Sequence, residues 1–272
     1  MNNLYLRTVT GIIYVAITVG AIIFSPYVTS VLFLMITLTA VAEFLKIFRG
    51  RARPILSLTL IISGIVYGVI ALQSLDVLIP KHLTLLVIPV LAVFAIELFR
   101  KSTTPFLNIA VTFVVLLYVV LPLALLNNLY EFGIILNGAS FQFILTFFIL
   151  IWVNDTGAYL TGLLIGRNRM YPAVSPKKTW EGFVGGAVLA LLAGWLSARY
   201  IDGFEEVSWV VFTVIIIIFA TVGDLVESKL KRNFNVKDSG SILPGHGGIL
   251  DRFDGVLLSA PVLFLYIKYC IS

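Results

Sequence analysis

Nine apolar stretches, each close to the length of a membrane-spanning helix, run through this sequence. A helix needs roughly 20 consecutive, mostly apolar residues to cross a bilayer. The sequence therefore predicts an all-α polytopic membrane protein with about nine transmembrane helices. The predicted spans are Thr8–Phe24, Val28–Phe48, Pro54–Gln73, Leu83–Phe99, Pro105–Leu126, Phe141–Ile165, Phe183–Tyr200, Ser208–Glu227 and Phe253–Ile271.

The composition excludes an ordinary soluble domain. Hydrophobic residues make up 60% of the chain and charged residues only 12%, against about 45–50% and about 25% in soluble domains. Cys270 is the single cysteine, so an internal disulfide is impossible. The first apolar stretch lacks a clear small-residue cleavage site and is expected to stay as an uncleaved helix.

Positive charge is distributed unevenly between the two sides that alternating spans define. With the N-terminus placed inside, all of the 19 Lys and Arg residues fall on the inner side except Lys81, Arg199 and Lys268. This asymmetry predicts a cytoplasmic N-terminus, an outer C-terminus and an odd number of spans. Because loop asymmetry accounts for the net charge of +5, we expect no nucleic-acid partner.

The polar residues outside the predicted helices concentrate in two inner loops, 166–182 and 228–252. We therefore predict that residues 1–135 form a scaffold of helices one to five. Residues 136–272 would carry helices six to nine and the two cytoplasmic loops that form the catalytic site. The expected location is the inner (cytoplasmic) membrane, with the site facing the cytoplasm.

Three aspartates are predicted to gather at the inner ends of the last two helices. Asp224 lies near the end of the eighth helix, and Asp251 and Asp254 begin the ninth, on one helical face. Carboxylates at this depth are costly and repel one another, so a hard divalent cation such as Mg²⁺ is their natural partner. The alternative is a salt-bridge network with neighbouring cations; these are Lys231, Arg232 and Arg252.

Other acidic residues also lie within or near the predicted spans. Asp155, beside Asn154, is about three turns inside the sixth helix. It is expected to be a further metal ligand or the floor of a polar cavity, and the alternative is a polar contact between helices. Glu43 and Glu97 lie near inner helix ends, where we expect ion pairs; the candidate partners are Lys46, Arg100 and Lys101.

The first inner loop, "GRNRMYPAVSPKKTWEG", has the character of a phosphate site. Lys177 and Lys178 precede a predicted helix start at Thr179–Trp180, and both lysine clusters and helix N-termini bind phosphate. For Arg167 and Arg169 the alternatives are the positive-inside bias or contact with anionic lipid headgroups.

The second inner loop, "SKLKRNFNVKDSGSILPGHGGILDRFDG", is rich in glycine. Gly245, Gly247 and Gly248 allow the backbone to approach a ligand closely, although turns use glycine too. His246 is either a ligand, a proton carrier or a structural hydrogen-bonding residue.

This second loop resembles the signature of the phosphatidate cytidylyltransferases, also called CDP-diacylglycerol synthases. The pattern runs over 27 residues without a departure, and "SPKKTWEG" and "NDTGAY" also resemble family segments. The matching positions are Ser228, Leu230, Lys231, Arg232, Lys237, Asp238, Gly240, Leu243, Pro244, His246, Gly247, Gly248, Ile249, Asp251, Arg252, Phe253 and Asp254.

The resemblance implies that CTP and phosphatidate are the substrates, that CDP-diacylglycerol and pyrophosphate are the products, and that one or two Mg²⁺ ions take part. A monovalent cation is an alternative occupant of the second metal site. The implied catalytic residues are Asp224, Asp251, Asp254, Lys237, Arg252 and His246. The implied substrate-binding residues are Ser175, Lys177, Lys178, Thr179, Glu181, Ser228, Lys231, Arg232, Asp238, Gly247, Gly248, Asn154 and Asp155. The implied metal ligands are Asp224, Asp251, Asp254 and Asp155.

Two other functions fit part of the pattern. Intramembrane acids occur in ion-coupled transporters, but those bind near the midplane between repeated halves, and this chain shows no repeat. A related CTP-dependent enzyme acting on a polyprenol or an ether lipid is the second alternative. A homodimer is also possible on the sequence, because Gly185, Gly186 and Gly194 allow close helix contacts within one subunit or between two.

Overall fold

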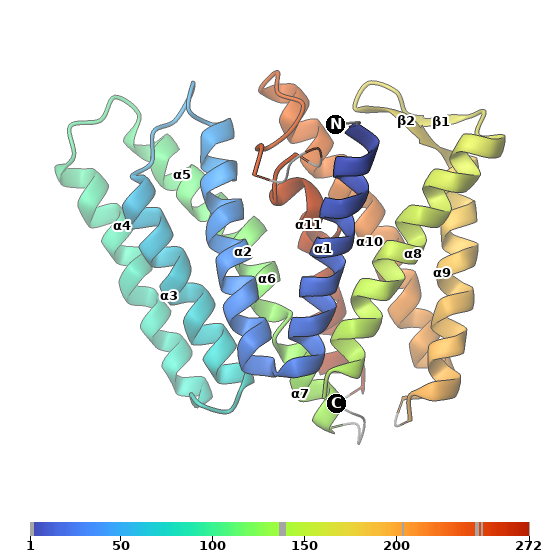
Figure 1. Cartoon of the computed structure of the whole chain (residues 1–272). Coiled ribbons are helices and arrows are strands. Elements are labelled where there is room, and N and C mark those ends of the chain that lie inside the picture. Colours follow the sequence, from blue (N-terminus) through green and yellow to red (C-terminus); the bar gives the residue numbers. More distant parts are fainter. Residues whose placement is uncertain (1–2, 136–139, 203, 243–244, 246, 272) are drawn as a thin grey trace. The chain divides into compact units, whose positions relative to one another are not determined.

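The computed structural model of the chain describes residues 3–135, 140–202, 204–242, 245 and 247–271. It is almost entirely helical, which confirms the predicted fold class (Figure 1). Two compact units are formed: Met1–Asn128 with Val236–Phe253, and Leu129–Asn235 with Asp254–Ser272. The segment after α10 therefore packs with the N-terminal helices. The division into a scaffold of residues 1–135 and a catalytic part of residues 136–272 stays a prediction.

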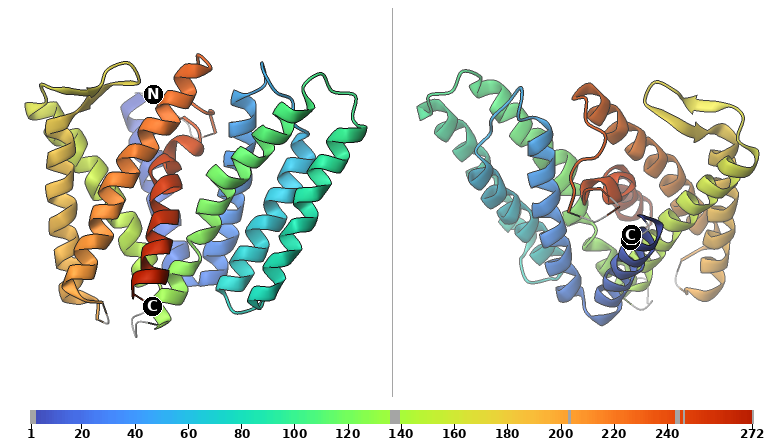
Figure 2. Two further views of the ribbon diagram at one scale, coloured as in Figure 1. Left: turned by 180° about the vertical axis from the view of Figure 1, so that it is seen from behind. Right: turned by 45° about the horizontal axis from the view of Figure 1, so that its top comes forward.

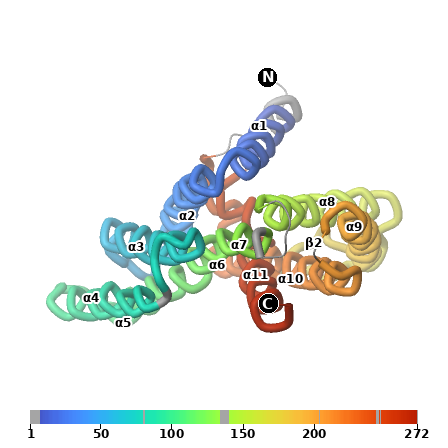
Figure 3. Tube along the Cα trace, turned by 90° about the horizontal axis from the view of Figure 1, so that it is seen from below, coloured from blue at the N-terminus to red at the C-terminus, as the bar shows by residue number. Residues whose placement is uncertain are grey.

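The first unit contains the helices of the N-terminal half. They are α1 (Asn3–Phe24), α2 (Pro26–Ile47), α3 (Leu56–Ser74), the 3₁₀ turn η1 (Pro80–Leu86), α4 (Val87–Phe99), α5 (Pro105–Val115), the π-helical turn η2 (Leu116–Val120) and α6 (Leu121–Leu125). Pro122 lacks the N–H that a helix needs at that position, which accounts for the π-helical turn just before it. Viewed along the helices, α3 lies between α2 and the α4–α5 pair (Figure 3).

The second unit begins with α7 (Asn128–Ile135), which the sequence did not predict, and α8 (Gln142–Ile165). A two-stranded antiparallel hairpin, β1 (Arg169–Tyr171) and β2 (Ser175–Thr179), precedes α9 (Trp180–Tyr200) and α10 (Glu206–Asn233). Finally α11 (Leu250–Tyr266) and the π-helical turn η3 (Ile267–Ile271) end the described chain, α11 passing from the first unit into the second after Phe253. The hairpin lies at the same end of this unit as the C-terminal end of α10 (Figure 2).

Eight segments in the described part of the chain are long and apolar enough to cross a membrane. They are Pro26–Ile47, Leu56–Ser74, Lys81–Phe99, Pro105–Gly133, Gln142–Ile165, Trp180–Tyr200, Glu206–Asn233 and Leu250–Cys270. The ninth predicted span, Thr8–Phe24, is helical but shorter. The count of nine and the orientation of the termini therefore remain predictions.

Glycines in α9 set the packing of the second unit. A Cβ at Gly185 would collide with the Thr161 side chain of α8, and one at Gly186 would lie 2.5 Å from the Asn154 carbonyl oxygen. A Cβ at Gly194 would collide with Thr213 of α10. These glycines thus serve helix contacts within the chain, and the homodimer stays an expectation that they do not support.

Candidate functional site

Asp224 is the centre of a polar cluster in the second unit. It lies on α10 about 22 Å along the helix from the buried Trp209 at the opposite end. Its Oδ2 forms an ion pair with Lys178 Nζ of β2 at 2.5 Å. Its Oδ1 accepts a hydrogen bond from Ser228 Oγ at 3.1 Å. The sequence predicted all three residues for the site, and the structure brings them together.

Two glycines bring Asp254 of α11 to this cluster. A Cβ at Gly223 would collide with the carbonyl oxygen of Asp254, and one at Gly255 would lie 3.2 Å from the Ala220 side chain. The backbones of α10 and α11 therefore cross closely beside both aspartates. Asp254 is half-buried and lies within electrostatic range of Asp224, Asp155 and Glu227.

Glu227 was not predicted. It is fully buried, and its Oε2 lies 2.6 Å from Nζ of Lys231, one turn further along α10. Lys231, expected to bind substrate or to pair with one of the three aspartates, is thus paired with a different acid. The i, i+3 spacing of Asp224 and Glu227 on one helical face was the available signal.

The β1–β2 hairpin leads directly into α9, and side chains at the start of this helix hydrogen-bond around it. Thr179 is buried and caps the helix, its Oγ1 accepting from Gly182 N at 3.1 Å, which confirms the predicted helix start. Glu181 accepts hydrogen bonds from the main-chain N–H groups of Arg167 and Asn168, all at 3.1 Å. Both side chains therefore support the hairpin, and their contact with substrate stays a prediction, as it does for Ser175 and the exposed Lys177.

Asn154 and Asp155 occupy neighbouring positions of α8 with different surroundings. Asn154 is buried, and its Oδ1 has no hydrogen-bond partner among the described residues. Asp155 is exposed and lies within electrostatic range of Asp254. The structure thus joins Asp155 to the predicted acidic group.

Asp251 is held by main-chain donors in the first unit. Its Oδ2 accepts from Gly248 N at 2.8 Å and from Ser239 N at 3.0 Å. Gly247 has a φ of +84°, a conformation that favours glycine, and a Cβ there would approach Asp251 Oδ2 to 2.7 Å. The glycines expected to form a phosphate cradle therefore fold around an aspartate, and their binding of phosphate stays a prediction.

Glu43 of α2 does not have the partner predicted from the sequence. It was expected to pair with Lys46, but its fully buried carboxylate accepts from Leu250 N at 2.9 Å and from Ser239 Oγ at 3.3 Å. The prediction for Glu97 is confirmed, because its Oε1 lies 2.7 Å from Arg100 Nη1.

The remaining predicted residues are exposed or undescribed. Lys237, Asp238 and Arg252 are exposed in the first unit, and Arg232 is exposed in the second. His246 lies outside the described residues.

The acidic cluster of the second unit, formed by Asp155, Asp224 and Asp254, has some of the properties of a metal site. Asp155, Asp224 and Asp254 offer only oxygen donors, the ligands that Mg²⁺ prefers, so the donor chemistry fits. In the described residues no three His, Cys, Asp or Glu side chains are arranged to hold one ion together, and Lys178 neutralises Asp224. Lys178 pairs only with Asp224 Oδ2, so Oδ1, which accepts from Ser228 Oγ, is the Asp224 oxygen that a magnesium ion would share without breaking the ion pair.

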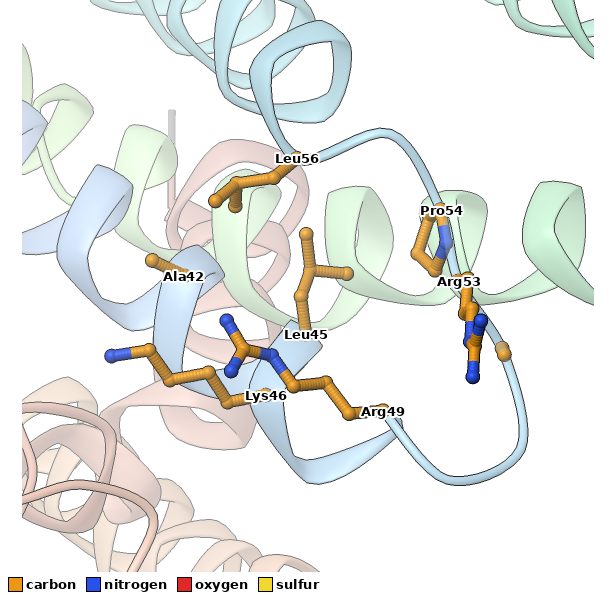
Figure 4. Close-up of a pocket in the computed structure, with 8 residues that line it drawn as sticks. Ala42, Leu45, Lys46, Arg49, Arg53, Pro54 and Leu56 are labelled. Carbon is orange, nitrogen blue, oxygen red and sulfur yellow. The ribbon is translucent and has the colours of Figure 1, made fainter.

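A basic pocket of about 420 Å³ lies at the α2–α3 connection (Figure 4). Its lining residues are Ala42, Leu45, Lys46, Arg49, Ala52, Arg53, Pro54 and Leu56. Two hydrogen bonds hold the main chain of Arg53. Its carbonyl oxygen accepts from Arg100 Nη1 at 2.7 Å, and its N–H donates to Asn108 Oδ1 at 2.8 Å. Within the described residues, the side chains of Lys46, Arg49 and Arg53 form no ion pair.

Comparison with known proteins finds relatives that align with about half of the chain and a family whose profile matches nearly all of it. Relatives named phosphatidate cytidylyltransferase occur in Staphylococcus saprophyticus (46% identity over 129 residues, 47% of this chain and 49% of the relative) and Staphylococcus haemolyticus (48% over 124 residues, 45% and 47%). The chain thus spans about half the length of the curated relatives it matches. The sequence profile of the Cytidylyltransferase family, in contrast, matches residues 5–270. Because that match extends over nearly the whole chain, the chain belongs to the Cytidylyltransferase family.

Proposed function

We propose that the chain transfers the cytidylyl group of CTP to phosphatidate, giving CDP-diacylglycerol and pyrophosphate. The observation that carries the proposal is the cluster in which Asp224 is bound by Lys178 and Ser228 beside Asp254. Family membership and the names of the relatives, phosphatidate cytidylyltransferases, support the same substrates. A lipid phosphate and a soluble triphosphate both reach the level of helix ends, and Lys178 and Asp254 lie next to the first turns of α9 and α11.

The proposed reaction is an in-line displacement at phosphorus. A phosphate oxygen of phosphatidate forms a bond to the α-phosphorus of CTP, and the bond from that phosphorus to the α–β bridging oxygen breaks, releasing pyrophosphate. Such reactions depend on positioning and charge neutralisation, and an ionised phosphate nucleophile does not require a strong base. Lys178 would contact the polyphosphate from the rigid hairpin, and Ser228 would orient Asp224.

Magnesium is proposed as the cofactor. Asp224 and Asp254 would hold it, with Asp155 and Asp251 as further oxygen donors. When bound, the ion would neutralise charge on the phosphate oxygens. The remaining charge of the triphosphate would be offset by Lys237, Arg232 and Arg252. We assign no role to a monovalent cation, the alternative occupant of a second metal site.

The orientation of the chain is also a proposal. In the first unit, the basic α2–α3 and α4–α5 connections lie at one end, opposite the connection from α3 to α4 (Figure 1). In the second unit, the hairpin and the basic end of α10 lie at one end together. Positive loops face the cytoplasm, so we propose an inner-membrane protein whose site faces the cytoplasm.

One assay tests the function. Purified chain is mixed with phosphatidate micelles and CTP, with and without Mg²⁺, and pyrophosphate and labelled lipid are measured. We expect both products in equal amounts only with Mg²⁺. A parallel reaction with polyprenol micelles that incorporates label when the phosphatidate reaction does not would reject the proposed lipid substrate. The chain reconstituted in liposomes that takes up substrate without releasing pyrophosphate would reject the enzyme.

Lys178→Gln is expected to raise the KM for CTP about tenfold, because hydrogen bonds to charged groups contribute about 1.5–3 kcal/mol. The kcat should change less, since Lys178 would bind the polyphosphate in both the ground state and the transition state. Steady-state kinetics with varied CTP measure both constants. Lys81→Gln, an exposed lysine on η1, is the control. An unchanged KM in Lys178→Gln would limit Lys178 to its ion pair with Asp224.

The basic pocket is proposed to contact the acidic headgroups of the bilayer, because no ion pair to its cations is found in the described part of the chain and the apolar side chain of Leu56 is exposed beside them. Each cation near an anionic surface contributes about 1 kcal/mol, so Arg49→Gln with Arg53→Gln should lower the preference for phosphatidate over phosphatidylcholine by about thirtyfold. Native mass spectrometry of lipid-bound protein measures the preference. Lys101→Gln, exposed at the same end but outside the pocket, should not change it. Displacement by inorganic phosphate alone would show a phosphate site without lipid selectivity.

A further inference from the structure

Glu43 is a fully buried acid in an apolar helix for which the proposed reaction gives no role. Its carboxylate binds the segment that follows α10, and this segment and α2 both belong to the first unit. One oxygen, Oε2, accepts from Leu250 N at 2.9 Å and from Ser239 Oγ at 3.3 Å. A buried carboxylate is costly unless it is hydrogen-bonded. Because Oε1 has no hydrogen-bond partner among the described residues, the burial of Glu43 depends on these two contacts of Oε2.

The contact with Leu250 caps a helix from outside its own sequence. Leu250 is the first residue of α11, and the first N–H groups of a helix have no acceptor within it. Negative charge is also favourable at this end of the helix dipole. Glu43 therefore fixes where α11 begins, although it lies on α2.

The contact with Ser239 connects Glu43 to Asp251. The Ser239 hydroxyl donates to Glu43, while its main-chain N–H donates to Asp251 Oδ2 at 3.0 Å. Gly248 donates to the same Asp251 oxygen at 2.8 Å. A Cβ on Gly248 or on Gly240 would collide with the Glu43 carboxylate, so glycine at both positions lets the loop close over it. One buried side chain thus holds the loop that holds Asp251.

We propose that Glu43 is a positioning residue that holds Ser239 and the first residue of α11, Leu250, and so places Asp251 for catalysis. The inference rests on the proposed function for its catalytic part. It also assigns a task to the N-terminal half of the chain, because α2 would act on the reaction through the main chain of the signature loop.

The test is Glu43→Gln, which keeps the size of the side chain and removes its charge. We expect kcat to fall about tenfold, since a hydrogen bond to a charged group contributes about 1.5–3 kcal/mol, while the KM for CTP changes less than twofold. Hydrogen exchange at the Ser239, Gly248 and Leu250 amides should accelerate. Glu97→Gln is the matched control, because it removes a buried carboxylate on α4 whose partner is Arg100. It should lower the melting temperature and leave exchange in 239–251 unchanged.

The outcomes separate the two proposals. If the wild-type chain makes no CDP-diacylglycerol, the proposed function fails, and hydrogen exchange still decides whether Glu43 orders the loop. Unchanged exchange in Glu43→Gln overturns the inference, and so does faster exchange with an unchanged kcat, which would make Glu43 merely structural. Should Glu43→Gln fail to fold, Ser239→Ala, which removes one donor, must shift exchange and kcat in the same directions by smaller amounts.

Discussion

Asp254→Asn is expected to lower the rate of pyrophosphate release by about a hundredfold or more, because metal-ion charge stabilisation contributes several kcal/mol. The folded chain should be as stable as the wild type, or more stable. Burial of the Asp254 carboxylate is the main cost, and the nearby carboxylates of Asp224, Glu227 and Asp155 add to it, so a neutral amide at this position relieves the native state. Activity and stability would then change in opposite directions, as expected where a functional site is strained.

The measurement combines the CTP assay at varied Mg²⁺ with thermal unfolding in detergent. Asp224→Asn should lose activity to a similar extent, although it also frees Lys178 from its ion pair. Asp202→Asn is the control, an exposed aspartate at the opposite end of the second unit. If Asp254→Asn kept full activity and an unchanged dependence on Mg²⁺, the metal proposal would be wrong.

Gly223→Ala is expected to impair both stability and activity by adding a single methyl group. The new Cβ would collide with the carbonyl oxygen of Asp254, which is main chain and cannot rotate away. Overpacking of this kind costs about 1–3 kcal/mol. Because α11 must move away from α10, the distance between Asp224 and Asp254 should increase, and we expect at least about a tenfold loss of activity.

Gly64→Ala is the matched control for this experiment. A Cβ at Gly64 of α3 meets no atom within 4 Å, so the substitution should be neutral or stabilise the helix by about 1 kcal/mol. Thermal unfolding and pyrophosphate release are measured for both variants. Gly223→Ala with wild-type stability and activity would show that the close crossing of α10 and α11 is not needed.

Hydropathy predicted the helices well because each span must satisfy its own backbone hydrogen bonds in lipid. The ends were less accurate. The span predicted as Ser208–Glu227 is Glu206–Asn233 in the structure, since the polar turn that carries Ser228 and Lys231 continues the same helix. The β1–β2 hairpin was not predicted, because its strands are short and carry Pro176 and lysines instead of alternating apolar residues.

Part of the candidate site could also be predicted from residue types and spacing. Asp224, Lys178 and Ser228 were all chosen, but their mutual contacts were not. Glu227 was missed although it lies three residues from Asp224. Glu43 was assigned to Lys46, one turn away, whereas Ser239, its partner in the structure, lies 196 residues further along the chain.

The sequence by itself determined a helical membrane protein and the loop that carries the cytidylyltransferase pattern, and it predicted the side to which the cations belong. Hydrophobic length, charge asymmetry and motif spacing are local properties, so they can be read along one chain. Only the tertiary structure decided which acid each cation neutralises and which carboxylate caps α11. Those pairings depend on helix crossings that glycines such as Gly223 permit, and a close approach of two backbones leaves no periodic signal in either segment.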